Sequence, residues 1–143
     1  MARQKRSGLK GPPNEAEGGR ATDAALQRDR DKYRHAVELS EQIAWVADSN
    51  GLIIDVTRRW SELTGLGKLE TLGSGWVQAL HPADIGRTSA AWSRSLQSGE
   101  PIDIEYRVRE RGGAFRWMRA RATPGRDSKG RVAVWYGTLE DID

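Results

Sequence analysis

Cysteine is absent from the 143 residues, and only two histidines, His35 and His81, occur. Without thiolates the chain can form no disulfide, no cysteine-ligated zinc or iron–sulfur site and no cysteinyl–flavin adduct. Two imidazoles also exclude a multi-histidine metal site. No apolar run reaches the roughly 18 residues that a membrane-spanning helix needs, so we expect no membrane insertion. The N-terminus lacks the apolar segment of a secretory signal, and we therefore expect a cytoplasmic protein.

Positive charge is concentrated near the N-terminus. The net charge is +3, but residues 1–34 carry nine Lys and Arg against five Asp and Glu, whereas residues 35–143 carry fourteen against fifteen. A nucleic-acid-binding domain would place a basic surface on its folded part. Since the bulk of this chain is close to neutral, we expect no nucleic-acid binding. We interpret residues 1–22, which are rich in Gly, Pro and charge, as a flexible basic tail.

Residues 23–40 contain neither Gly nor Pro and follow a helical pattern. Leu26, Tyr33 and Val37 recur at a spacing that places them near one face, and charged residues occupy much of the remainder. A narrow apolar stripe suits packing against a partner helix or against the outside of a sheet. We therefore expect an amphipathic helix that takes part in dimerisation, with Leu26, Tyr33 and Val37 at the interface of a homodimer.

Short β-prone runs and helical pieces alternate along the rest of the chain. Asn50-Gly51 between two apolar runs predicts a hairpin with both residues at the centre of a type I′ turn. Pro82 favours the start of a longer helix, and Ser98-Gly99 its end. This order predicts an α+β fold in which helices cover one face of an antiparallel sheet. The expected elements are strands at 43–48 and 52–57, helical pieces at 58–65 and 68–75, a helix at 82–98, and strands at 101–110, 114–123 and 131–143.

The strand at 101–110 alternates apolar and charged residues, which is typical of a half-buried antiparallel strand. Gly112-Gly113 predicts the turn to the next strand. A two-residue loop there would pair Tyr106 with Arg119 and turn this arginine inward, where it could bind an acidic ligand. The alternative is that Arg119 pairs with acidic side chains such as Asp103 across the solvated face.

A set of short motifs follows a specific order along residues 36–143, which resemble a PAS domain of the third PAS-fold subtype with its C-terminal PAC motif. The ending WYGTLEDID also resembles PAS modules that precede bacterial histidine kinases. One departure is Arg58-Arg59, where the family often has Asn. The motifs are Asn50-Gly51, WSELTG (60–65), Trp76 with HPAD (81–84), EYR (105–107) with FRW (115–117), and WYGT (135–138) with DI (141–142).

The resemblance implies a five-stranded antiparallel sheet in the order 2-1-5-4-3, with helices on one face and an N-terminal flanking helix; residues 41–143 would form the domain. It also implies a sensory module of a bacterial two-component system. Such a module binds a small molecule or a partner and relays the change through a dimer to an effector such as a histidine kinase. The alternative is a ligand-free interaction and dimerisation module. The sequence holds no catalytic constellation, so we expect no enzymatic activity in this chain.

Six tryptophans accompany a single phenylalanine. Tryptophan either fills a core or walls a pocket for a planar or aliphatic ligand, and both interpretations stay open here. The elements that the PAS fold would place around a pocket supply the candidate lining residues. These are Trp45, Trp92, Tyr106, Trp117, Arg119 and Trp135.

The sequence does not identify a cofactor, and the resemblance argues against haem and flavin. Haem-binding relatives carry their ligand histidine on or near the long helix, and residues 82–99 contain none. The photochemical flavin type needs the missing cysteine. His81 is either a haem ligand or pH sensor, or a residue at the helix start that satisfies backbone groups; its place in a His-Pro-x-Asp pattern favours the second interpretation.

Overall fold

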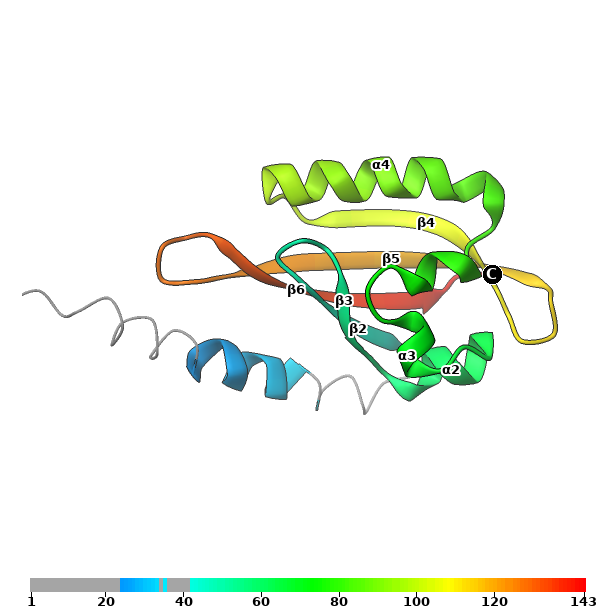
Figure 1. The fold of residues 1–143 in the computed structure, drawn as a ribbon, viewed down its shortest axis with the longest axis horizontal. Helices are drawn as coiled ribbons and strands as arrows, with labels where there is room; N and C mark the ends of the chain where they lie inside the picture. Colours follow the sequence, from blue (N-terminus) through cyan, green and yellow to red (C-terminus); the bar gives the residue numbers. More distant parts are fainter. Residues whose placement is uncertain (1–23, 34, 36–41) are drawn as a thin grey trace, which may run out of the picture.

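The computed structural model describes residues 24–33, 35 and 42–143. Five of its strands form one antiparallel sheet in the order β3-β2-β6-β5-β4 (Figure 1). Counted along the chain this is 2-1-5-4-3, which confirms the predicted topology. The elements are β2 (Ile43–Asp48), β3 (Ile53–Val56), α2 (Arg58–Thr64), α3 (Lys68–Thr71), the 3-10 helix η1 (Gly75–Ala79), α4 (Pro82–Ser98), β4 (Ile102–Arg109), β5 (Phe115–Arg126) and β6 (Val132–Asp141).

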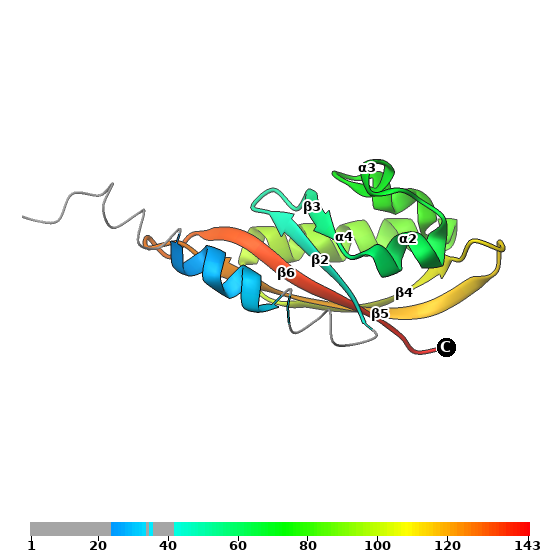
Figure 2. The ribbon, with the colours of Figure 1, turned by 90° about the horizontal axis from the view of Figure 1, so that it is seen from below.

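The helices α2, α3 and α4 cover one face of the sheet, here called the inner face (Figure 2). The core lies between them and the sheet. Alternate residues of β4 and β5 point into it, including Tyr106, Val108, Met118 and Ala120, each at most 5% exposed. The alternation predicted for 101–110 is therefore confirmed. Across the described ranges, the helices all fall short of the length and apolarity needed to cross a membrane.

The hairpin between β2 and β3 is present as predicted, but its turn is of a different type. The N–H of Gly51 donates to the carbonyl of Asp48 (3.0 Å), so Ser49 and Asn50 occupy the central positions. The predicted type I′ turn centred on Asn50 and Gly51 is therefore wrong. Gly51 follows the turn with φ 85°. A Cβ there would lie 2.9 Å from Nε1 of Trp92, so the turn lies directly against α4.

Local chemistry fixes both ends of α4. Nδ1 of His81 accepts a hydrogen bond from the N–H of Ala83 (3.0 Å), and Pro82 occupies the first helical position. Gly99 ends the helix in the left-handed conformation, with φ 77°. The interpretation of His81 as a residue that satisfies backbone groups at the helix start is thus confirmed.

The register of β4 against β5 differs by one residue from the prediction. The connecting loop spans residues 110–114 rather than two glycines alone. Tyr106 therefore pairs with Met118, and Arg119 pairs with Glu105. Because a shift of one residue reverses the face of every side chain on a strand, Arg119 lies on the face away from the helices, here called the outer face. The predicted pairing of Arg119 with Tyr106 is wrong.

The N-terminal helix (residues 24–33) packs on the outer face. The hydroxyl of Tyr33 donates to the carbonyl of Gly137, and the hydroxyl of Tyr136 donates to the carbonyl of Leu26 (3.2 Å). The rings of the two tyrosines lie 5.3 Å apart. Of the two packing modes expected for the apolar stripe, this structure contains the second, on the outside of a sheet. Val37 and the predicted tail 1–22 lie outside the described residues.

Candidate ligand-binding site

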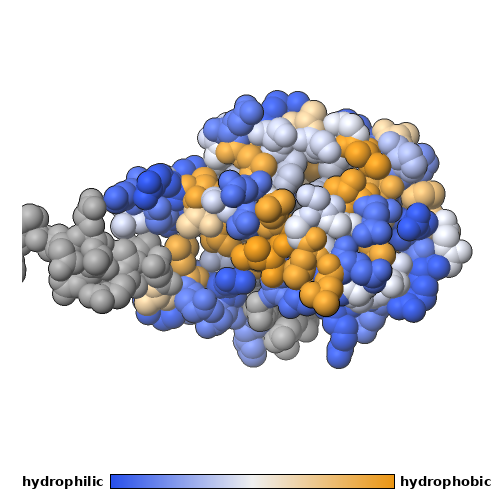
Figure 3. Space-filling view, in the orientation of Figure 1, coloured by the Kyte–Doolittle hydropathy of each residue, from blue (hydrophilic) through white to orange (hydrophobic). Residues whose placement is uncertain are grey.

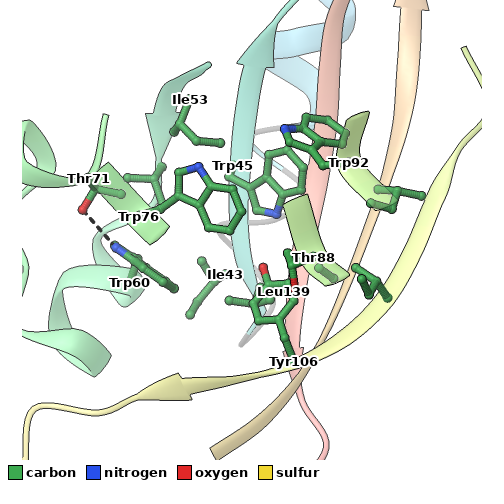
Figure 4. A pocket seen from close by; sticks show the side chains of 14 residues that line it. Ile43, Trp45, Ile53, Trp60, Thr71, Trp76, Thr88, Trp92, Tyr106 and Leu139 are labelled. Atoms are coloured by element: carbon green, nitrogen blue, oxygen red, sulfur yellow. Dashed lines mark hydrogen bonds between the residues drawn. The ribbon is translucent and has the colours of Figure 1, made fainter. Parts of the chain in front are cut away.

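A cavity of about 50 Å³ lies between the inner face and the helices (Figure 4). The strands β2, β3, β4, β5 and β6 supply one side of it, and the helical segments supply the other. Every described residue that lines it is uncharged, and most are apolar. Such a lining suits an uncharged molecule with apolar surface. The aromatic and hydroxyl-bearing residues of the lining are Trp45, Trp60, Trp76, Trp92, Tyr106, Thr71 and Thr88.

Three of the predicted pocket residues form one aromatic cluster. The ring of Trp92 meets Trp45 edge-on, with centroids 5.8 Å apart, and meets Trp135 at 5.1 Å. Nε1 of Trp92 donates to the carbonyl of Gly51 (3.2 Å) and so ties α4 to the β2–β3 turn. Trp45 and Trp92 line the cavity, as does the predicted Tyr106. Trp135 is fully buried and packs behind Trp92 without lining the cavity.

The opposite part of the cavity lining comes from residues that were not predicted from the sequence. Trp60 on α2 is 3% exposed, and its Nε1 donates to the hydroxyl of Thr71 on α3 (3.0 Å). Trp76 on η1 lies with its ring centroid 6.3 Å from that of Tyr106. Both tryptophans stand within the sequence motifs, which is a usable signal. The direction in which their side chains point is not readable from periodicity, because helices of seven and five residues are too short to show one.

Thr88 is a further residue of the cavity wall that sequence reasoning missed. It lies on α4, is 2% exposed, and its hydroxyl oxygen is buried without a hydrogen-bond partner among the described residues. Tyr106 lies beside it on the cavity wall (Figure 4). Burial raises the pKa of the Tyr106 hydroxyl far above its ordinary value, so this group stays protonated. The polar atoms at this end of the cavity are therefore neutral hydroxyls.

Gly137 on β6 connects the cavity to the outer face. On the inner side the indole of Trp45 lies so close that a Cβ at this position would overlap its ring carbons. The carbonyl of Gly137 accepts the hydrogen bond from Tyr33 on the N-terminal helix. A shift of the Trp45 ring would thus press directly on the backbone that holds this helix.

Trp117 and Arg119, the other two pocket candidates, are not brought to the cavity. Arg119 forms a two-point ion pair with Asp103 (2.8 and 2.6 Å), which matches the predicted alternative of cross-strand pairing. The hydrogen bonds from Arg119 lower the pKa of the Asp103 carboxyl. Trp117 is 39% exposed, and the guanidinium of Arg107 lies 5.0 Å from its ring centroid. Both residues belong to the outer face.

A buried ion pair holds the start of α4 against the edge strand β4. Asp84 is 2% exposed and accepts hydrogen bonds from the backbone N–H, Nε and Nη2 of Arg107 (2.9, 3.0 and 2.8 Å). These bonds hold the pKa of Asp84 well below its usual range. The sequence suggested only a favourable position for Asp84 in the helix dipole. Its partner, 23 residues away, was not predicted.

Hydrophobic side chains also reach the surface. On the face shown in Figure 3 they gather over β3 and α3. Leu69 on α3 is 88% exposed, and Leu52, just before β3, is 42% exposed. Within the described ranges no group of three or more His, Asp or Glu side chains is arranged to hold a metal ion. The cavity is therefore the best-defined candidate site.

Known proteins share this architecture. The family model described as "PAS fold" matches residues 53–139, which is more than half of the chain. The chain therefore belongs to the PAS family, whose members in sensor proteins are sensory signalling modules. The N-terminal domain of a diguanylate cyclase with PAS/PAC sensor from Marinobacter aquaeolei has a TM-score of 0.65 and 21% identity; the match covers 71% of this chain and 95% of that one.

Two curated relatives are much longer than this chain. The uncharacterized protein y4lL of Sinorhizobium fredii is 42% identical over 124 residues, a match that covers 87% of this chain and 15% of that protein. The peroxide stress-activated histidine kinase mak1 of Schizosaccharomyces pombe is 26% identical over 130 residues, which covers 83% of this chain and 8% of the kinase. This chain thus corresponds to a small part of each.

Proposed function

We propose that this chain is a sensory module that binds a small molecule in the tryptophan-lined cavity and passes the change to its N-terminal helix. The observation that carries the proposal is the two-sided contact of Gly137, with the cavity residue Trp45 on one side and Tyr33 of the helix on the other. A ligand shifts an equilibrium only if it contacts two states differently. A ligand that displaces the Trp45 ring meets that requirement. The ring already packs against Gly137, so a state with the ring displaced differs from the ligand-free state at this contact.

The readout that we propose is a homodimer linked to an effector such as a histidine kinase. Residues 41–143 would be the sensory domain, residues 23–40 the dimerisation helix, and residues 1–22 a basic tail. This chain covers only a small part of each of the two relatives, and one of them is named a histidine kinase. Both facts support a role inside a larger signalling protein. Any catalytic step would then belong to the effector. The bacterial two-component setting and cytoplasmic location are parts of the same proposal.

A variant at Gly137 tests the relay. Gly137→Ala would push the Trp45 ring away from β6, so we expect altered amide hydrogen exchange across residues 24–33 without any ligand. Gly86→Ala is the matched control, because a Cβ at Gly86 meets no atom within 4 Å. Equal exchange of the N-terminal helix in the two variants and the wild type would refute the relay.

Two further measurements test ligand binding and dimerisation. Native mass spectrometry of the purified chain, followed by mass spectrometry after denaturation, would reveal a bound small molecule as a mass that is lost. An absorbance band beyond that of tryptophan would instead indicate haem or flavin, against our expectation. Deletion of residues 1–40 should weaken dimerisation in sedimentation experiments; an unchanged association constant would exclude this helix as the dimer element.

A ligand-free interaction and dimerisation module is the second candidate function. The observation that favours it is the small volume of the cavity, about 50 Å³, into which four tryptophans project. A dimer that carries no bound molecule after gentle purification, and whose cavity takes up no small probe, would support this second candidate over the first.

A further inference from the structure

The Thr88 hydroxyl is a buried polar group without a hydrogen-bond partner in the described part of the chain. A threonine in the middle of a helix commonly bonds to the carbonyl one turn earlier. Thr71, also on the cavity wall, shows the ordinary arrangement: it accepts from Nε1 of Trp60 and donates to the carbonyl of Gly67 (3.0 and 2.9 Å). An unpaired buried hydroxyl is destabilising. Residue 88 therefore carries a cost in stability that the apolar alternative, valine, would avoid.

The surroundings of Thr88 define what could pair with it. Tyr106 and Leu139 lie beside it in the cavity, and Trp45 lies across from it (Figure 4). No charged side chain of the described residues lines the cavity. A charged ligand would lose its hydration without gaining a counter-ion, which is strongly unfavourable. An uncharged oxygen atom can accept a hydrogen bond from the threonine hydroxyl at no such cost.

The volume of the cavity sets the size of the molecule. One water-sized sphere needs roughly 10–15 Å³ measured in this way, and an apolar cavity of about 150 Å³ accommodates benzene. The cavity here, at about 50 Å³, is a third of that volume. At one water-sized sphere for each atom, it therefore has room for about three or four non-hydrogen atoms, and a molecule of this size is in contact with the tryptophan walls.

We propose that the cavity selects a small uncharged molecule with one oxygen atom, such as a short alcohol or ketone, whose oxygen accepts a hydrogen bond from Thr88. The tryptophan walls contact the carbon atoms, and the threonine hydroxyl distinguishes this molecule from a hydrocarbon of the same shape. This inference rests on the proposed ligand-binding function and names the chemical class of its ligand.

Two probes on the full chain test the assignment by NMR. Xenon reports on an accessible apolar cavity, and propan-2-ol reports on the oxygen site. Wild-type protein should show saturable shifts of cavity amides with both probes. Thr88→Val, which keeps the shape and removes the hydroxyl, should retain xenon binding and bind propan-2-ol about tenfold more weakly. Thr88→Ser, which keeps the hydroxyl, should bind propan-2-ol much as the wild type does.

The stability of the ligand-free variants gives a second readout. Because Thr88→Val removes an unpaired buried hydroxyl, its melting temperature should rise by about 3 °C. Thr88→Ser keeps the unpaired group and should not show this rise. A threonine whose hydroxyl served only to stabilise the fold would behave in the opposite way, and a lower melting temperature in Thr88→Val would overturn the assignment.

The outcomes separate this inference from the proposed function. Equal propan-2-ol affinity in wild type and Thr88→Val, with xenon binding intact, would refute the role of Thr88 and leave the cavity as a ligand site. Absence of saturable shifts with either probe in the wild type would refute both. Binding of propan-2-ol to wild type and Thr88→Ser but not to Thr88→Val, with xenon taken up by all three, would establish the assignment.

Discussion

The two faces of the sheet differ in whether the polar side chains on or near them have partners. On the outer face, charged side chains of neighbouring strands pair with one another: Arg119 pairs with Asp103, and Arg121 pairs with Glu140. On the inner face, the residues that line the cavity are apolar or neutral, and the hydroxyl of Thr88, on the helix α4 that covers this face, has no hydrogen-bond partner among the described residues. Bulk water can replace the partner of an exposed charged group. Thr88 is 2% exposed, so its unpaired hydroxyl destabilises the fold more than a broken surface ion pair would. An unpaired hydroxyl that lines a cavity therefore points to binding, whereas a satisfied ion pair on the outer face indicates only a solvated surface.

The sharpest test of this contrast compares two tryptophans on opposite faces. Trp135→Ala should destabilise the domain by about 4 kcal/mol, because it empties a fully buried site that packs against Trp92. Trp117→Ala, on the outer face, should cost about 1 kcal/mol or less, chiefly through its contact with Arg107. Urea unfolding measures both. Similar losses in the two variants would remove the distinction between the faces.

A second pair of variants compares two carboxylates whose pKa values are both lowered by arginine. Asp84→Asn should destabilise by about 2 to 3 kcal/mol at pH 7, since it breaks a buried, multiply bonded group. Asp103→Asn, at an exposed ion pair, should have a far smaller effect.

The pH dependence of the Asp84 contribution follows from the sign of its shift. A carboxyl whose folded pKa lies below its unfolded value, about 3.9, stabilises the fold above that value and loses the contribution as pH falls further. The gap in unfolding free energy between wild type and Asp84→Asn should therefore narrow below pH 4. A gap that stays constant from pH 7 to pH 3 would contradict the assigned role.

A further variant tests how the N-terminal helix (residues 24–33) is held on the outer face. Tyr33→Phe removes the hydroxyl that bonds to the carbonyl of Gly137. We expect a loss of about 1 kcal/mol in the free energy of local opening of residues 24–33, measured as faster amide hydrogen exchange. Exchange across β4 should not change. Uniformly faster exchange throughout the domain would mean that the helix is part of the global folding unit.

Arg119→Ala should have the smallest effect. Its guanidinium lies on the outer face in an exposed ion pair, so the melting temperature should move by about 1 °C or less. The affinity for propan-2-ol should not change, since Arg119 does not line the cavity and lies on the opposite face of the sheet. A clear loss of probe binding in this variant would show that the two faces are coupled through β5.

The sequence carried enough information for the elements and their arrangement. Pro82 and Gly99 delimit α4 by backbone chemistry that acts within a few residues, and the alternation of 101–110 identifies β4 and its buried face. The order of motifs along the chain was sufficient for the family and hence for the sheet topology. Three of the six pocket candidates, Trp45, Trp92 and Tyr106, line the cavity, and whether it binds a ligand stays a prediction.

What the tertiary structure alone decided was which side chains meet. The β4–β5 loop is longer than the glycine pair suggested, and that single residue of register moved Arg119 to the outer face. Trp60, Trp76 and Thr88 come to the cavity from three separate helical segments whose facing is set by packing against the sheet. Local propensity acts within a few residues, so it determines where elements begin and end. Partners such as Asp84 and Arg107, or Trp45 and Gly137, are far apart in the chain, and only the packed structure brings them into contact.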